Sequence, residues 1–136
     1  MTSGEIGCTT SHLKAIKHWY ETSDSPYAII VEDDLDLQLA RFWNFTWSDF
    51  AAKLPYDWDV VQLAIICTGN LHVQLHKRFV NDFSTAAYMI TRHHAEKILK
   101  HHVRGDKYKL DNGVKPRPVA DDLIYNSGNT FSIPLF

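Results

Sequence analysis

The chain has 136 residues, 45% of them hydrophobic and 12% aromatic, which is enough apolar material for one globular domain with its own core. Its formal net charge is −2 and its 14 Lys and Arg residues are scattered, so neither nucleic acid nor an anionic membrane is an expected partner. No apolar stretch reaches the roughly 20 residues of a transmembrane helix, and the first residues carry no secretion signal. These features predict a single cytoplasmic domain over residues 1–136.

Cysteine and histidine form no recognisable metal-binding motif. Cys8 and Cys67 are too far apart for a CxxC pair and are expected to be reduced thiols. The pairs 93–94 and 101–102 are histidines, but neither has the i, i+4 spacing of a helical zinc site. We interpret them as part of a solvated helix face.

The first predicted element is a helix over residues 9–22. Three candidate N-caps at 9–11 precede Leu13, Ile16 and Tyr20, which fall on one helical face. Residues 4–7, which include two glycines, are then expected to form flexible backbone just before the helix N-terminus. Unpaired N–H groups and the helix dipole favour anions at such a place, and a diphosphate is the anion we expect.

The next elements predict a β-α-β unit. Residues 27–31 are a continuous apolar, largely β-branched run, which is typical of a strand buried on both faces of a parallel sheet. Thr46 or Ser48 can cap a short helix that extends to Leu54, before a proline. Residues 59–66 predict a second buried strand.

The second half of the chain continues the alternation of strands and helices. Residues 68–80 indicate a loop or hairpin, 85–90 a strand, 92–101 a helix and 102–118 a long ordered loop. The pattern predicts an α/β fold with an open, mostly parallel sheet and flanking helices. Ligands bind such sheets beyond the carboxyl ends of the strands.

Three adjacent carboxylates, Glu32, Asp33 and Asp34, directly follow the first predicted strand. Like charges this close repel unless a cation or a proton neutralises them. Strand alternation sends Glu32 and Asp34 to the same side, where they can hold one hard divalent ion and leave positions open for a diphosphate. The alternative is a strand that simply ends on acidic residues in solvent.

A second acidic pair, Asp121 and Asp122, follows an extended segment fixed by Pro118 and begins an apolar helical pattern. These carboxylates can stabilise the N-terminus of a helix through its dipole. Alternatively, one of them can take a proton from an acceptor hydroxyl or serve as a further metal ligand.

In this order, the segments resemble glycosyltransferase family 25, which includes bacterial lipooligosaccharide galactosyltransferases and animal procollagen galactosyltransferases. The family has counterparts of four segments: the opening Gly-Glu-Ile-Gly-Cys motif, the strand that ends in acids, the later strand with the start of its helix, and the late Asp pair. The matching segments are residues 4–12, 28–34, 84–97 and 118–124, and 132–136 resembles a family strand.

The resemblance implies a GT-A-like fold, a UDP-hexose donor, Mn²⁺ or Mg²⁺ as the metal, a saccharide or hydroxylated acceptor, and inversion at the anomeric carbon. It points to galactosyl transfer in lipopolysaccharide biosynthesis. It implies that Glu32 and Asp34 hold the metal and that Asp121 or Asp122 activates the acceptor. The donor-binding residues that it implies are Gly4, Glu5, Gly7, Ser11, His12 and Asp33.

Family members usually carry a strand and a helix ahead of the Gly-Glu-Ile-Gly motif that help to hold the nucleotide base, and this chain begins almost at the motif. A non-catalytic sugar-nucleotide-binding fragment is therefore one alternative. A haloacid-dehalogenase-like phosphatase is another, because Asp34 and Asp36 after an apolar strand resemble the nucleophile loop of that class. The phosphatase would use Asp34 as phosphoryl acceptor and needs a Lys near the site.

Overall fold

The computed structural model describes residues 1–66, 72–111 and 119–136. The helices are α1 (Ser3–Thr22), α2 (Trp47–Ala52), α3 (Arg92–His102), α4 (Ala120–Tyr125) and the 3-10 helix η1 (Gln38–Phe42). The strands are β1 (Tyr27–Val31), β2 (Val60–Gln62), β3 (His76–Lys77), β4 (Ala87–Thr91), β5 (Val103–Arg104), β6 (Lys107–Tyr108) and β7 (Thr130–Ser132).

Five strands form one mixed sheet in the order β1-β4-β2-β7-β3. The β1–β4, β4–β2 and β7–β3 pairings are antiparallel, and β2–β7 is parallel. The fold is thus α/β as expected, but the expectation of a mostly parallel sheet is wrong. β4 lies between β1 and β2, so these two strands run in the same direction without pairing. A continuous apolar run indicates burial, and it does not determine the direction of the neighbouring strand.

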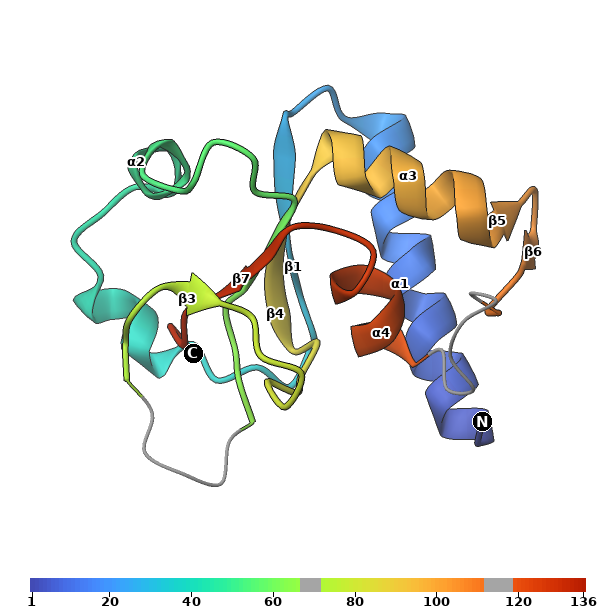
Figure 1. The fold of residues 1–136 in the computed structure, drawn as a ribbon, viewed down its shortest axis with the longest axis horizontal. Helices are drawn as coiled ribbons and strands as arrows, with labels where there is room; N and C mark the ends of the chain where they lie inside the picture. Colours follow the sequence, from blue (N-terminus) through green and yellow to red (C-terminus); the bar gives the residue numbers. More distant parts are fainter. Residues whose placement is uncertain (67–71, 112–118) are drawn as a thin grey trace.

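The sheet separates two apolar layers (Figure 1). Helices α1, α3 and α4 cover one face, where Ile16, Ile90 and Ile124 are fully buried. The other face packs Met89 and the rest of a second buried cluster against α2 and its preceding segment. This second layer is rich in aromatic rings, in which Trp43 makes an edge contact with Phe136 at 4.7 Å between centroids. β4 contributes to both layers.

Helix α1 begins six residues earlier than the sequence predicted. Thr2 is its N-cap: the Thr2 hydroxyl accepts from the backbone N–H of Glu5, and the Glu5 carboxylate accepts from the Thr2 N–H at 2.7 Å. This reciprocal capping box satisfies two of the unpaired donors of the first turn. Thr9, which was predicted to be a cap, instead lies inside the helix and donates its hydroxyl to the Glu5 carbonyl.

Most other predicted elements are present with shifted bounds. The structure confirms the strand at 27–31, but the expected burial on both faces is wrong: β1 is an edge strand whose first four side chains are half-buried and whose last, Val31, is exposed. It also confirms Thr46 as the N-cap of α2 and the strand and helix that form β4 and α3. The strand predicted at 59–66 shortens to β2. The predicted loop 102–118 begins with the β5–β6 hairpin, which turns at Gly105 with φ of +59°, and its residues 112–118 lie outside the described part.

Two histidines assigned to a solvated helix face are buried. The His94 ring has no exposed surface, and its Nε2–H donates to the Ile124 carbonyl at 2.8 Å. His102 bonds through Nδ1 to the Lys109 carbonyl, also at 2.8 Å. Burial lowers the pKa of both rings from the ordinary 6.5, which keeps them neutral near pH 7. They join α3 to α4 and to the segment after β6.

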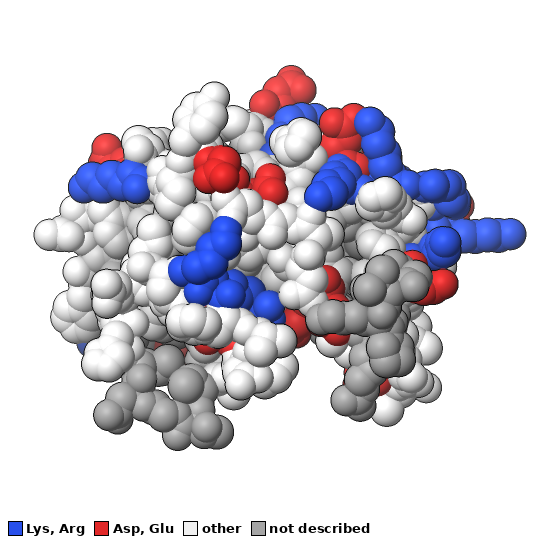
Figure 2. Space-filling view, in the orientation of Figure 1, with Lys and Arg blue, Asp and Glu red and all other residues white. Residues whose placement is uncertain are grey.

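Charges are mixed on the surface. In Figure 2, basic side chains lie over α3 and, separately, over β3, which carries Lys77, with acidic side chains between them. On α3, Lys100 pairs with Glu96. Among the described residues, no helix is both long and apolar enough to cross a membrane.

Candidate functional site

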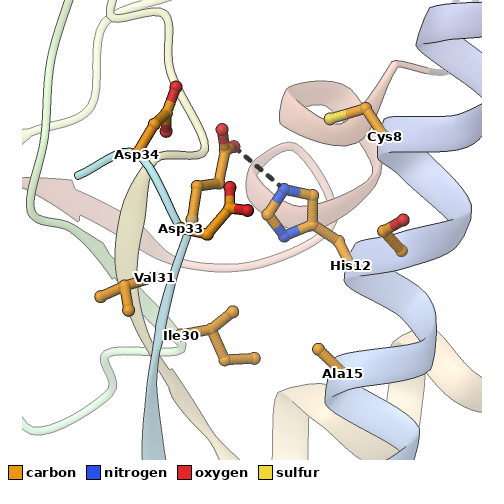
Figure 3. A pocket seen from close by; sticks show the side chains of 9 residues that line it. Cys8, His12, Ala15, Ile30, Val31, Asp33 and Asp34 are labelled. Carbon is orange, nitrogen blue, oxygen red and sulfur yellow. Dashed lines mark hydrogen bonds and ion pairs between the residues drawn. The ribbon is translucent and has the colours of Figure 1, made fainter.

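A cleft of about 450 Å³ opens between α1 and the turn that follows β1 (Figure 3). One wall is the side of α1 that carries Ser11 and His12, and the other wall is the acidic segment 32–34. The lining residues are Cys8, Ser11, His12, Ala15, Ile30, Val31, Glu32, Asp33 and Asp34. None of these described residues is Lys or Arg, so the cleft attracts cations.

The three acids form a turn and do not continue the strand. β1 ends at Val31, the Glu32 N–H still donates to the Ala86 carbonyl at 2.8 Å, and the Leu35 N–H donates to the Glu32 carbonyl. Strand alternation therefore does not govern where these side chains point. In Figure 3 the Asp33 carboxylate is directed toward His12, while that of Asp34 points away from the ring. Both line the cleft together with Glu32.

A chain of hydrogen bonds orients His12. Its Nδ1 lies 3.1 Å from the Tyr88 hydroxyl, and its Nε2 lies 3.2 Å from Glu32 Oε1. Burial and the nearby Glu32 charge raise the pKa of Tyr88 well above 10.0, so its hydroxyl keeps its proton and can donate to Nδ1. The Glu32 carboxylate can only accept, so in the neutral ring Nε2 carries the proton and donates to Glu32, which leaves Nδ1 to accept from Tyr88.

Glu32 is also held from the segment just before β4. The Thr85 hydroxyl donates to Glu32 Oε1 at 2.9 Å. The preceding residue, Ser84, has a φ of +129°, a strained conformation for a residue with a side chain. Its carbonyl accepts from the Tyr125 hydroxyl, and its N–H donates to Asp121 Oδ1 at 2.8 Å. Strain of this kind persists only where the surroundings fix the backbone, and here it places Thr85 against Glu32.

The late acids lie in the first turn of α4, as the sequence predicted for a helix start, and they differ in their surroundings. Asp121 supports Ser84 and acts electrostatically on Cys8, which lines the cleft. Asp122 accepts at 2.6 Å from the side chain of Asn126, the residue that caps the C-terminus of α4. Among the described residues, neither acid lines the cleft; Asp121 is linked to it by its charge near Cys8 and by its bond to Ser84, which precedes the Thr85 that bonds Glu32. The Pro118 that precedes this helix lies outside the described residues.

Cys8 is a cleft residue that the sequence reasoning overlooked. It is exposed, and its sulfur lies within 4.8 Å of a ligand atom of both His12 and Glu32. Partial burial and the charges of Glu32 and Asp121 raise the pKa of its thiol above 9.0. The signal available in the sequence was its i, i+4 spacing from His12, which is visible only once the helix is known to include residue 8.

The opening motif is positioned differently from the expectation. Gly4, Glu5 and Gly7 lie in the first two turns of α1, so the expected flexible backbone before a helix N-terminus is wrong. Among the described residues, these three do not line the cleft. Glu5 instead caps the helix through its bond with Thr2. Ser11 remains a cleft residue and lies one position before His12.

Residues 1–112 match the sequence profile of glycosyltransferase family 25, which is described as an LPS biosynthesis protein. No curated protein and no solved structure gives a match. The matched region includes α1, the acidic turn and β4, and therefore all the described residues that line the cleft. It covers well over half of the sequence. The chain belongs to glycosyltransferase family 25.

Proposed function

We propose that this protein transfers a hexose, galactose by preference, from a UDP-sugar to a hydroxyl group of a saccharide or another hydroxylated acceptor. The reaction uses Mn²⁺ or Mg²⁺, inverts the anomeric carbon and belongs to lipopolysaccharide biosynthesis. A GT-A-like fold is part of the proposal, supported by the common direction of β1, β2 and β7 beside helices that cover one face.

The observation that carries the proposal is the acidic cleft. It joins Ser11 and His12 from the opening motif to the carboxylates 32–34 that follow β1, although the two segments are separated along the chain. Three carboxylates without a lining Lys or Arg among the described residues fit a hard divalent ion with oxygen ligands. A bound ion in turn attracts the diphosphate of the donor.

Glu32 and Asp34 would hold the metal ion, which when bound offsets the charge that develops on the UDP leaving group. His12 and Thr85 orient the Glu32 carboxylate by donating to Oε1. Asp33 and Ser11 border the donor from the two walls of the cleft. We prefer Asp121 to Asp122 as the base for the acceptor hydroxyl, because its charge acts on Cys8 in the cleft, whereas Asp122 bonds Asn126.

The test is a UDP-release assay with UDP-galactose, UDP-glucose and their N-acetyl forms, with Mn²⁺ or after its removal with a chelator. Asp34→Ala is expected to lower the Mn²⁺-dependent rate by about 100-fold, because it removes a metal ligand. The matched control is Asp36→Ala, which removes an exposed acid two residues away that bonds the Gln38 N–H. Equal rates in the two variants would remove Asp34 from the mechanism.

The alternatives give different results in the same assay. A non-catalytic sugar-nucleotide-binding fragment would bind UDP with Mn²⁺ in calorimetry and release none from a UDP-sugar. A phosphatase would release phosphate from an aryl phosphate without any sugar nucleotide. The phosphatase needs a Lys beside its nucleophile, and the described residues lining the cleft include none.

A further inference from the structure

Three side chains of different chemistry converge at the α1 side of the cleft. Cys8 Sγ, His12 and Glu32 offer one sulfur, one ring nitrogen and one carboxylate oxygen, and these atoms all lie within 4.8 Å of one another. Cys8 and His12 are four residues apart on α1 and therefore project from the same side of the helix. Glu32 approaches from the turn after β1. The set is thus built from two separate elements.

We propose that Cys8, His12 and Glu32 form a binding site for a borderline-soft divalent ion, Zn²⁺ or Co²⁺. Sulfur and imidazole ligands favour such ions, whereas Mn²⁺ and Mg²⁺ prefer all-oxygen sites such as the carboxylates of the neighbouring turn. Three protein ligands leave the fourth tetrahedral position open toward the cleft, as in catalytic zinc sites. The site does not depend on the proposed transferase reaction, although it shares Glu32 with it.

The distances suit this ion. Two ligands at about 2.0–2.1 Å from a tetrahedral Zn²⁺ are about 3.3 Å apart, and His12 Nε2 lies 3.2 Å from Glu32 Oε1. A sulfur at about 2.3 Å from the metal lies about 3.6 Å from each of the other ligands. The Cys8 sulfur, now at most 4.8 Å away, therefore needs to move by only about 1 Å. A side-chain rotation on the exposed surface of α1 can supply that movement.

The surrounding hydrogen bonds can serve the metal-bound state. Binding through Nε2 moves the ring proton to Nδ1, which then donates to the Tyr88 oxygen, because a hydroxyl accepts as well as donates. The Thr85 hydroxyl continues to donate to Glu32. Binding of one ion releases one proton, because the Cys8 thiol becomes a thiolate while the His12 ring keeps its single proton.

The experiment is a titration of the chelator-treated full chain with Co²⁺, followed by visible and near-ultraviolet absorption. We expect one ion per chain, intense d–d bands typical of tetrahedral cobalt and a thiolate-to-cobalt charge-transfer band. Cys8→Ser should abolish the charge-transfer band, and Glu32→Gln should weaken Co²⁺ binding at least about 10-fold. The matched control is Cys67→Ser, which removes the other thiol of the sequence and should leave the band unchanged.

Absence of the charge-transfer band in the wild-type chain would overturn the proposal, and so would its persistence in Cys8→Ser. Far-ultraviolet circular dichroism of each variant separates loss of a ligand from loss of the fold. Asp34→Ala separates this site from the transferase mechanism, because it should lower Mn²⁺-dependent UDP release and leave the cobalt spectrum intact. A cobalt spectrum in a chain without transferase activity would support the site and count against the proposed function.

Discussion

At the scale of single residues, Asp121 combines an observed structural contact with a proposed catalytic role. Its Oδ1 accepts from the Ser84 N–H and so helps to hold a strained backbone in place. The proposed catalytic role needs its negative charge, because a base must take a proton. An amide oxygen can still accept from the Ser84 N–H, but an amide cannot act as the base. Asn at this position therefore distinguishes a structural acid from a catalytic one.

We expect Asp121→Asn to lower UDP-sugar-dependent transfer by about 100- to 10,000-fold, which is the range for loss of a general base. Its unfolding free energy should stay close to that of the wild type, because the Asn oxygen still accepts from Ser84. The matched variant is Asp122→Asn, which changes the neighbouring acid of α4 that bonds to Asn126. If the two variants transferred at the same rate, Asp121 would not be the base.

His12 shows how far single residues could be interpreted from sequence alone. Its place in the opening motif indicated donor binding, and the structure does bring it to the cleft with Glu32. Its bond to Tyr88 could not be foreseen, because the two residues are 76 positions apart and no local pattern pairs them. Cys8 was missed for a related reason: its relation to His12 depends on the helix register.

At the scale of elements, two glycines occupy opposite situations. Gly7 lies inside α1, and a Cβ added to it would meet nothing within 4 Å. Gly128 lies before β7, and a Cβ there would lie 2.5 Å from His94 Cε1 and 2.9 Å from Asp59 Cβ. The buried His94 ring is bonded to Ile124 and has little room to move. The same substitution should therefore have opposite effects at the two positions.

We expect Gly7→Ala to raise the unfolding free energy by about 0.5–1 kcal/mol, because Ala loses less backbone entropy in a helix. Gly128→Ala should lower it by about 1–3 kcal/mol, through overpacking against His94 and Asp59. Urea unfolding followed by circular dichroism measures both. A Gly128→Ala chain as stable as the wild type would show that the α3–α4 contact can open to admit a methyl group.

The start of α1 was misplaced because two local signals conflict. Gly4 and Gly7 disfavour a helix, and the Thr and Ser residues at 9–11 are good N-caps, so the sequence favoured a later start. The pattern Thr2-x-x-Glu5 is itself a capping-box signature and was the stronger indicator. The correct start changes the candidate site, since it moves the opening motif from a loop into the helix.

At the scale of the whole molecule, β4 connects the two apolar layers. Its alternate residues face opposite sides: Ile90 belongs to the layer under α1 and α3, and Met89 to the aromatic layer. Both side chains are fully buried. Loss of β4 packing on one side therefore disturbs the strand that the other side needs, and the two layers should unfold together.

We expect Ile90→Ala to lower the unfolding free energy by about 2–5 kcal/mol, as for other buried Ile truncations. Tryptophan fluorescence, which reports mainly on the aromatic layer, and far-ultraviolet circular dichroism should shift to the same lower denaturant midpoint. Ile66→Ala is the matched control, because this Ile is 70% exposed and should change stability by less than about 0.5 kcal/mol. Separate midpoints for the two probes would contradict a single cooperative unit.

The sheet shows the limit of prediction at this scale. Apolar runs correctly located the strands that became β1, β2 and β4, because burial leaves a direct mark on composition. Their order and direction depend on which strand inserts between which others, and nothing in the local sequence of β1 identifies β4 as its antiparallel neighbour. The β-α-β pattern gave the common direction of β1 and β2, but it did not reveal that an antiparallel strand lies between them.

The bond between His12 and Tyr88 also has a consequence for how the protein comes to be made. Its partners are 76 positions apart, so a ribosome must complete the strand that carries Tyr88 before the first helix can acquire its buried contacts there. Closing so long a loop costs more chain entropy than forming a helix, whose contacts are local. The contact that orients His12 therefore cannot form until residue 88 has been synthesised, and a shorter nascent chain lacks it.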